Sequence, residues 1–369
     1  IGLVGCGQMG GHYADVFQKM NDVSVVACCD PTPPKLKTFS EEKGIPRSYV
    51  DYRRMLMEEH LDGVLNVTPD FLHAEVAGLV LHSGIPLMTE KPLAGDLESC
   101  RSLLDTAVSS GIPNVVNFSK RHASAVETAR ILVTGGSLGH LKKIDASYLQ
   151  GWVYTMDWGD WREVHAWTWR LNREFAPLGV LGDLGSHLID LLTHITGGNV
   201  VQVSDSVLGV VDKGIERVGG LLLDSPDFAS ASLELTESIP VSFKVSRIDS
   251  GHKDDLILVF EGEDARLSIN LSRDRKNVRL VPYKPQELPE NCLDPETLKP
   301  IGSLMAEMEV EITTHRPKTN YQHFADILNG RPAAAPGITE GFTNLAVLDA
   351  VLASSGADGT PVRPDGFPE

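Results

Sequence analysis

The chain has 369 residues with 42% hydrophobic and 22% charged side chains, which is ordinary for a globular protein of about two domains. Its net charge of −17 argues against nucleic acids and anionic membranes as partners, because both are polyanions. No apolar run approaches the roughly 20 residues that a membrane helix needs. Five scattered cysteines lack metal-ligand spacing and indicate a reducing compartment, so we expect a cytoplasmic protein.

The chain opens on a short apolar run followed by closely spaced glycines. Residues 1–10 read IGLVGCGQMG, which places Gly5, Gly7 and Gly10 in the G-x-G-x-x-G spacing. If residues 1–4 form a buried strand, each glycine has a task. Gly5 permits a tight turn, Gly7 lets a diphosphate approach the backbone, and Gly10 lets the helix pack on the strand. The diphosphate would then bind at the helix N-terminus, where N–H groups are free and the dipole favours negative charge. The residues assigned to this turn are Gly5, Gly7, Gln8, Met9 and Gly10. Because the strand begins at once and the first residue is Ile1 rather than Met, we expect a short trimmed segment before it.

A second apolar segment, residues 23–29, ends in an acidic residue. Asp30 follows Gly10 by about 20 residues, where a carboxylate accepts hydrogen bonds from the adenosine ribose of a dinucleotide. The alternative is an ordinary strand–turn–helix without a ligand. Asp30 favours NAD, since a carboxylate repels a 2′-phosphate, while the nearby Thr32 and Lys35 leave NADP possible.

Apolar strands and amphipathic helices alternate at short intervals through the first third of the chain. We expect strands at 1–4, 23–29, 61–67, 85–89 and 114–118, and helices at 8–20, 31–43, 71–83 and 97–110. This alternation is typical of a doubly wound parallel sheet, so residues 1–121 are predicted to form a Rossmann domain.

The pattern changes after residue 121. After a helix at 124–133, we expect strands at 142–151, 200–211, 218–223, 229–235, 241–245, 256–261, 265–269 and 278–281. A helix at 180–195 interrupts them, a Pro-rich surface loop spans 284–301, and closing helices lie at 324–328 and 341–352. Residues 122–369 are therefore predicted to form an α+β domain with a large, mainly antiparallel sheet, whose closing helices could also pack on the first domain.

The first candidate for chemistry is a lysine just after a predicted parallel strand. Lys91 belongs to the segment TEKP at residues 89–92. Ligands of such sheets bind beyond the carboxyl ends of the strands, so this lysine would face the cofactor. The alternative is a solvated lysine at a strand end.

The second candidate is the segment GVLGDLGSHLID at residues 179–190. Asp183 and His187 are four residues apart, which places them on one helical face about 6 Å from each other. They could act as an acid/base pair, or Asp183 could be a first-turn acid and His187 a partly buried core residue. The helical spacing of His187, Asp190 and His194 also suggests a metal site, but no further ligand completes the set, so we expect none.

The third candidate is an aromatic segment that contains every tryptophan of the chain, between residues 152 and 169. Indoles stack on the apolar faces of sugars and can donate to hydroxyls, whereas the alternative is a small core or a subunit interface. Arg170 adds a group that could hold hydroxyls or a carboxylate. The substrate-binding residues predicted here are Tyr148, Trp152, Trp169 and Arg170.

Together these motifs make the chain resemble the glucose–fructose oxidoreductase, inositol dehydrogenase and MocA family (Gfo/Idh/MocA). The resemblance rests on GCGQMG, Asp30, the segment NVTPDFLHAEVA, the EKP triplet and GDLGSHLID, in this order. It implies that Lys91, Asp183 and His187 form the catalytic set, and that the Lys91–Pro92 peptide bond is cis. It also implies a cofactor lining of Thr68, Pro69, His73, Glu90, Lys91 and Asn117.

The expected reaction is hydride transfer between a nicotinamide and a secondary alcohol of a sugar, cyclitol or related polyol. His187 would take the hydroxyl proton, and Lys91 would stabilise the same oxygen or help to relay the proton. Asp183 would orient the substrate through a neighbouring hydroxyl. The alternatives are an NAD-dependent glycosidase or lyase that oxidises its sugar transiently, and a non-catalytic dinucleotide-binding sensor. A sheet with helices on one face only leaves its other face open, and the resemblance favours a homodimer or homotetramer.

Overall fold

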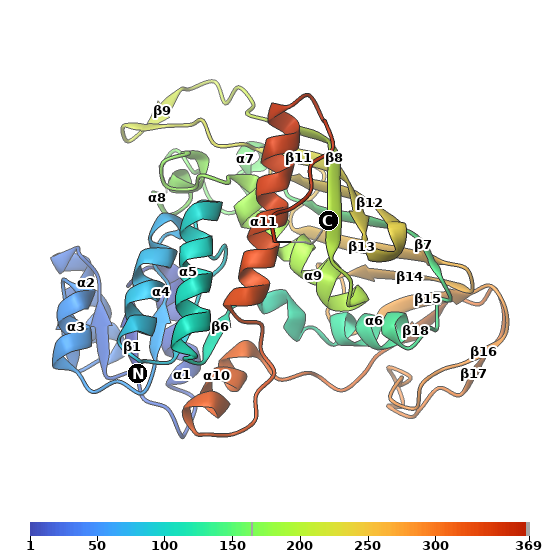
Figure 1. Cartoon of the computed structure of the whole chain (residues 1–369), viewed down its shortest axis with the longest axis horizontal. Helices are drawn as coiled ribbons and strands as arrows, with labels where there is room; N and C mark the ends of the chain where they lie inside the picture. The colour runs from blue at the N-terminus through green and yellow to red at the C-terminus, as the bar shows by residue number, and fades with distance from the viewer. Residues whose placement is uncertain (164, 367–369) are drawn as a thin grey trace. The chain divides into compact units, whose positions relative to one another are not determined.

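The computed structural model describes residues 1–163 and 165–366, and its contacts divide the chain into two compact units (Figure 1). The first unit comprises Ile1–Phe118, Glu174–Pro177 and Thr319–Leu345, and the second comprises Ser119–Arg173, Leu178–Lys318 and Ala346–Glu369. Residues 119–121, which the prediction placed in the first domain, belong to the second unit. Two later segments, however, belong to the first unit rather than the second.

The first unit contains a six-stranded parallel sheet in the order β3-β2-β1-β4-β5-β6. The strand order reverses between β1 and β4, which is the switch point where ligands of such sheets bind. Its strands are β1 (Gly2–Val4), β2 (Ala27–Cys29), β3 (Arg47–Tyr49), β4 (Val64–Asn66), β5 (Leu87–Thr89) and β6 (Asn114–Val116). Its helices are α1 (Gln8–Phe17), α2 (Pro33–Lys43), α3 (Tyr52–Glu58), α4 (His73–His82), α5 (Leu97–Ser110), α10 (Asn320–Leu328) and the beginning of α11 (Ile338–Gly356). The parallel Rossmann sheet is confirmed, whereas β3 and α3 were not predicted because they are short and mostly polar.

Helix α10 completes the core of the first unit. Its Tyr321 and Phe324 pack with Phe17 of α1 and with buried side chains of β1 and β4. A Cβ at Gly63, next to β4, would lie 3.0 Å from Phe324, so α10 approaches the backbone there closely. Residues more than 300 positions from the N-terminus therefore help to support the first strands.

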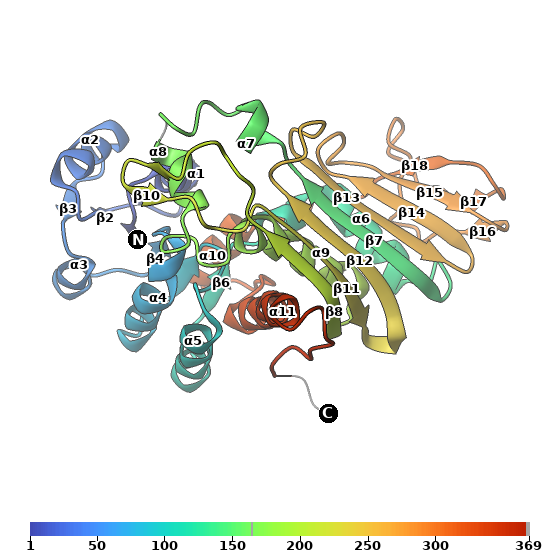
Figure 2. The same cartoon turned by 90° about the horizontal axis from the view of Figure 1, so that it is seen from above.

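The second unit contains an eight-stranded sheet in the order β18-β15-β14-β13-β7-β12-β11-β8 (Figure 2). All neighbours are antiparallel except β7 and β12. Its strands are β7 (Leu141–Leu149), β8 (Val200–Gly209), β11 (Phe228–Leu235), β12 (Ile239–Ser246), β13 (Asp255–Gly262), β14 (Ala265–Asn270), β15 (Val278–Pro282) and β18 (Val310–Ile312). The helices α6 (Ser124–Thr134) and α9 (Ser186–Thr196) contact this sheet and each other. The predicted mainly antiparallel domain is confirmed.

Three predicted segments of the second unit differ in detail. Residues 218–223 form a separate hairpin of β9 (Arg217–Val218) and β10 (Leu221–Leu222), because Gly219 and Gly220 have positive φ and make its turn. The predicted surface loop at 284–301 contains β16 (Gln286–Glu287), which pairs with β17 (Ser303–Leu304), and it buries Cys292. The predicted helix at 180–195 begins as a π-helix, η4 (Leu181–Gly185), before α9.

Candidate functional site

The glycine turn after β1 leaves the N-terminus of α1 open to an anion. Gly5 has a φ of 105°, and a Cβ there would lie 2.4 Å from the carbonyl oxygen of Val67. A Cβ at Gly10 would lie 2.1 Å from the carbonyl oxygen of Gly5, so only glycine fits at either position. At Gly7, by contrast, a Cβ would meet no atom of the described residues within 4 Å, and no side chain caps the helix. Since Gln8 and Met9 are also exposed, the first N–H groups of α1 fit a diphosphate.

Asp30, directly after β2, is a buried carboxylate that accepts a hydrogen bond at each oxygen. Its Oδ1 accepts from the Thr32 amide at 3.0 Å, and its Oδ2 accepts from the Cys6 amide at 3.1 Å and from Lys35 Nζ at 2.7 Å. Burial by itself would raise the pKa of Asp30, but the hydrogen bonds from Lys35 and the two amides outweigh it and hold this pKa below its usual value. An ionised carboxylate beside the glycine turn is suited to ribose hydroxyls.

His73, at the start of α4, connects two loops at the carboxyl ends of the strands. Its Nδ1 lies 2.6 Å from the carbonyl oxygen of Pro92, and its Nε2 lies 2.7 Å from that of Thr68. The side chain is buried, whereas Pro69 is exposed and Thr68 half-buried. His73 therefore holds the loop after β4 to the loop after β5, which carries Lys91.

Glu90 and Asn117 belong to a buried hydrogen-bond network. Glu90 Oε1 accepts from Tyr13 Oη at 2.6 Å and from Asn117 Nδ2 at 2.9 Å, and Asn117 Nδ2 also donates to Tyr321 Oη at 3.0 Å. Burial, and after it the charge of Glu90, raises the pKa of Tyr13 well above its ordinary value, so this phenol stays protonated as a donor. Tyr13 and Tyr321 were not predicted, because nothing in their local sequence indicates partners directly after β5 and β6.

Lys91 follows this network directly. Its backbone N–H donates to Glu90 Oε2 at 3.2 Å, and its peptide bond to Pro92 is cis, as expected. Its side chain is half-buried. The backbone before Lys91 is therefore held by Glu90 and its network, and the backbone after it is held by the contact between His73 and the carbonyl oxygen of Pro92.

In the second unit, Asp183 and His187 lie on either side of the junction between η4 and α9. Asp183 is partly exposed, and its Oδ2 lies 3.8 Å from Arg170 Nε. His187 is 8% exposed, and its ring centroid lies 6.3 Å from that of Tyr148. A π-helical turn is wider than an α-helical one. Since residues 181–185 are π-helical, Asp183 and His187 are not joined by the one regular α-helical turn that the sequence predicted.

Asp190 and His194, further along α9, lie in different surroundings from His187. Asp190 accepts from Arg121 through both carboxylate oxygens, with contacts between 2.5 and 3.0 Å. Burial, followed by the charges of Arg121 and Arg130, lowers the pKa of His194 to about 3. No group of three possible metal ligands occurs among residues 1–163 and 165–366.

The aromatic segment divides into a core and a half-buried part. Trp152 and Trp161 are each 2% exposed and pack with Leu171 and other apolar side chains, and Trp161 Nε1 donates to the carbonyl oxygen of Val153 at 2.9 Å. Trp152, predicted to bind substrate, is thus an interior side chain, as in the core alternative. The guanidinium of Arg170 lies 4.5 Å from the ring of the half-buried Trp169, and Trp158 and Trp167 are half-buried as well.

Tyr148 donates from Oη to Asp254 Oδ1 at 2.7 Å, and Gln150 Nε2 donates to the same oxygen at 2.7 Å. Burial, and then Asp254, raises the pKa of Tyr148 well above its ordinary value. Lys120 Nζ lies 5.2 Å from the centroid of the tyrosine ring. Tyr148, beside His187, thus contacts Asp254, which Gln150 also binds, and Lys120; the sequence assigned none of these three residues a role.

Family models match most of the chain. Residues 1–118 match the model described as "Oxidoreductase family, NAD-binding Rossmann fold" (GFO_IDH_MocA), and residues 126–268 match the GFO/IDH/MocA C-terminal domain.

Among the helices of the described residues, none combines the length and the apolarity that a membrane crossing requires.

Curated relatives include sugar dehydrogenases. Levoglucosan dehydrogenase of Pseudarthrobacter phenanthrenivorans is 27% identical over 208 residues, which cover 53% of this chain and 51% of the relative. D-glucoside 3-dehydrogenase of Escherichia coli is 28% identical over 209 residues, or 55% of each chain, so these matches span about half of either relative. A solved structure of levoglucosan dehydrogenase with NADH and levoglucosan has a TM-score of 0.78 at 20% identity and covers 99% of this chain and 98% of its own, which shows a shared fold.

Proposed function

This chain belongs to the Gfo/Idh/MocA family of NAD-binding oxidoreductases, and from that premise we propose that it is an NAD-dependent dehydrogenase of a sugar or related polyol. The reaction is reversible hydride transfer at a carbon that bears a secondary hydroxyl. The observation that carries the proposal is the glycine turn, whose uncapped helix N-terminus and open Gly7 suit a dinucleotide diphosphate. The names of the curated relatives support a sugar as the substrate class.

Each proposed catalytic residue has a chemical task. His187 accepts the proton of the reacting hydroxyl, since an imidazole serves as a base near neutral pH. Lys91 donates a hydrogen bond to the same oxygen and stabilises its negative charge. Asp183 accepts from a neighbouring hydroxyl, and Arg170 Nε lies 3.8 Å from its Oδ2. When bound, NAD supplies the hydride acceptor.

A panel of aldoses, anhydrosugars, glucosides and cyclitols tests the proposal, with NAD and NADP in parallel and absorbance of the reduced nicotinamide as the readout. We expect net NADH formation with at least one sugar and a preference for NAD. If the protein binds NADH but reduces no nicotinamide with any compound, dehydrogenase activity is contradicted. Release of product without net NADH would instead indicate the transient-oxidation alternative.

Assembly and location are part of the same proposal. The side chains of Ile257, Val259 and Val281 alternate with core residues of β13 and β15 and are only half-buried within one chain. An outward sheet face with such residues suits a homodimer or homotetramer. Sedimentation of the wild type and of Val259→Lys tests this, since a charge on that face should favour the monomer. The five cysteines are all free and buried, which supports a cytoplasmic location.

A further inference from the structure

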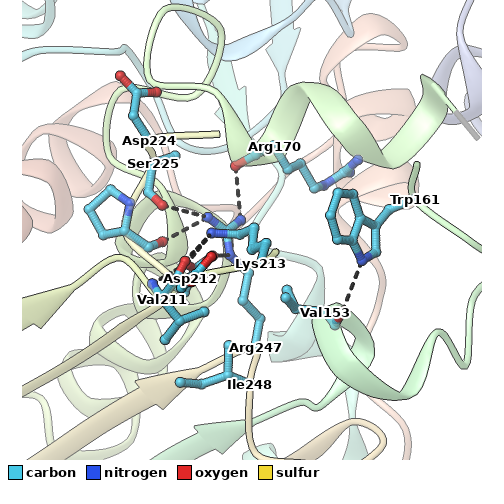
Figure 3. A network of polar contacts seen from close by, with 12 residues as sticks. Val153, Trp161, Arg170, Val211, Asp212, Lys213, Asp224, Ser225, Arg247 and Ile248 are labelled. Atoms are coloured by element: carbon cyan, nitrogen blue, oxygen red, sulfur yellow. Dashed lines mark hydrogen bonds and ion pairs between the residues drawn. The ribbon is translucent and has the colours of Figure 1, made fainter. Parts of the chain in front are cut away.

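A buried ionic cluster lies in the second unit, outside the predicted site residues. Lys213 follows β8, Asp227 precedes β11 and Arg247 follows β12. Their side chains are 0–1% exposed. Figure 3 shows Lys213 and Arg247 converging on a small region next to Ser225 and the backbone of Arg170. Charged groups are rarely buried so completely unless they are paired.

The carboxylate of Asp227 is the centre of the cluster. Its Oδ1 accepts from Arg247 Nε at 3.1 Å. Its Oδ2 accepts from Lys213 Nζ at 2.5 Å and from the Val211 amide at 2.9 Å. Both oxygens are therefore engaged, and Asp227 holds the guanidinium of Arg247 in one orientation.

The remaining donors of Arg247 bind backbone carbonyl groups. Its Nη1 donates to the carbonyl oxygen of Arg170 at 2.9 Å, and its Nη2 donates to that of Pro226 at 2.7 Å. A longer contact of 3.5 Å joins Nη2 to the carbonyl oxygen of Ser225. A planar guanidinium presents five donors on three nitrogens in a fixed fork, whereas the three donors of a lysine ammonium all radiate from one atom.

These carbonyl groups connect Arg247 to the two segments that carry the proposed substrate residues, directly at Arg170 and indirectly through Pro226. The carbonyl oxygen of Pro226 also accepts from the amide of Val180 at 3.0 Å, the residue that precedes η4 and its Asp183. The amide of Ser225 donates to the carbonyl oxygen of Leu171 at 3.0 Å, next to Arg170. Arg247 thus bonds directly to the Arg170 segment and, through one shared carbonyl oxygen, to the start of the Asp183 helix.

We propose that Arg247, held by Asp227 and Lys213, is a positioning residue that sets Arg170 and Asp183 in register for the substrate. The expected effect on the KM for a sugar rests on the proposed function. The structural part of the proposal does not, because it states only that one buried guanidinium connects residues 170–171 to residues 180–183. Loss of its fork of donors would release both segments while the sheet stays folded.

Hydrogen exchange of the full chain tests the structural content without any substrate. In Arg247→Lys we expect the amides of Val180 and Ser225 to exchange at least tenfold faster, while amides of β13 and β14 stay within twofold of the wild type. Leu267→Ala, which truncates a buried residue of β14, is the matched control and should give the opposite pattern. Unchanged exchange at Val180 and Ser225 in Arg247→Lys would overturn the proposal.

Steady-state kinetics then test the consequence with the sugar found active in the panel. In Arg247→Lys and Arg247→Met we expect KM for the sugar to rise at least tenfold, with Kd for NADH within twofold of the wild type. Leu267→Ala should lower the melting temperature but leave KM unchanged. If Arg247→Lys keeps both kcat and KM within twofold, or if Leu267→Ala raises KM equally, the positioning role is wrong. A wild type without sugar activity contradicts the proposed function alone, because the exchange result still decides whether Arg247 connects the segments.

Discussion

The glycine turn of the first unit and the Arg170–His187 region of the second unit are built by different means. The turn uses backbone N–H groups and the absence of side chains within ten consecutive residues. The second region uses side chains whose supports come from distant positions, such as Asp254 for Tyr148 and Arg247 for Arg170. A site made of local backbone tolerates few changes in sequence, whereas one made of distant side chains can vary while the fold persists. The dinucleotide side is therefore the part that a short motif can identify.

The strongest test of the second region is removal of its proposed base. We expect His187→Ala to lower kcat by roughly 10²- to 10⁴-fold, the usual contribution of a general base. NADH affinity should stay near that of the wild type, which fluorescence titration measures. His194→Gln on the same helix is the control and should keep kcat within about twofold. Full turnover by His187→Ala would remove this residue from the mechanism.

The first unit is tested by two glycines that differ in what surrounds them. In Gly7→Ala the new Cβ meets no described protein atom, so stability should hold while NADH affinity falls at least about tenfold, or ~1.4 kcal/mol. In Gly10→Ala the new Cβ collides with the Gly5 carbonyl, and we expect a loss of about 1–3 kcal/mol in folding free energy. Titration with NADH and urea unfolding separate the two effects. Equal NADH affinity in Gly7→Ala and the wild type would contradict a diphosphate at this turn.

The buried His194 of the second unit should make the free energy of unfolding depend on pH. Its pKa is about 3 in the folded state against an ordinary value of 6.5, so below pH 6.5 the unfolded chain binds a proton that the native state excludes. Stability is therefore lost as the pH falls from 6.5 towards 3, by about 1 kcal/mol between pH 7 and pH 5.5. Urea unfolding should show a shallower decline in His194→Gln than in the wild type. The exposed His60 offers a control substitution, His60→Gln, and an identical slope in all three proteins would contradict the assignment.

The smallest expected effect concerns Lys35, which pairs with Asp30 while 47% of its side chain stays exposed. Lys35→Ala should weaken NAD binding by less than about fivefold, because exposed ion pairs contribute about 0.2–1 kcal/mol. Lys37→Ala, on the same helix and more exposed, should have no effect. A much larger loss in Lys35→Ala would mean that this lysine, rather than Asp30, dominates recognition of the adenosine ribose.

Secondary structure was predictable wherever hydrophobic periodicity was strong. Helix α5 has the predicted bounds, and its C-cap is the expected Gly111. The separate hairpin β9–β10 was not predicted, because Val218 before the two glycines and Leu221–Leu222 after them read as one apolar strand in the sequence. Trp152 looked like a sugar-stacking residue since composition alone does not distinguish an exposed indole from a buried one. The roles of Lys91, Asp183 and His187 stay predictions.

By itself the sequence determined the two-part fold and the family, and it located the glycine turn and the acidic residue after β2, because each depends on residues that are consecutive or regularly spaced. Only the tertiary structure decided which side chains support them. Tyr321 joins Asn117 from 204 positions away, and Arg247 binds the carbonyl group of Arg170 from 77 positions away. Such contacts depend on which surfaces the packed core brings together, and no local pattern of residues encodes that choice.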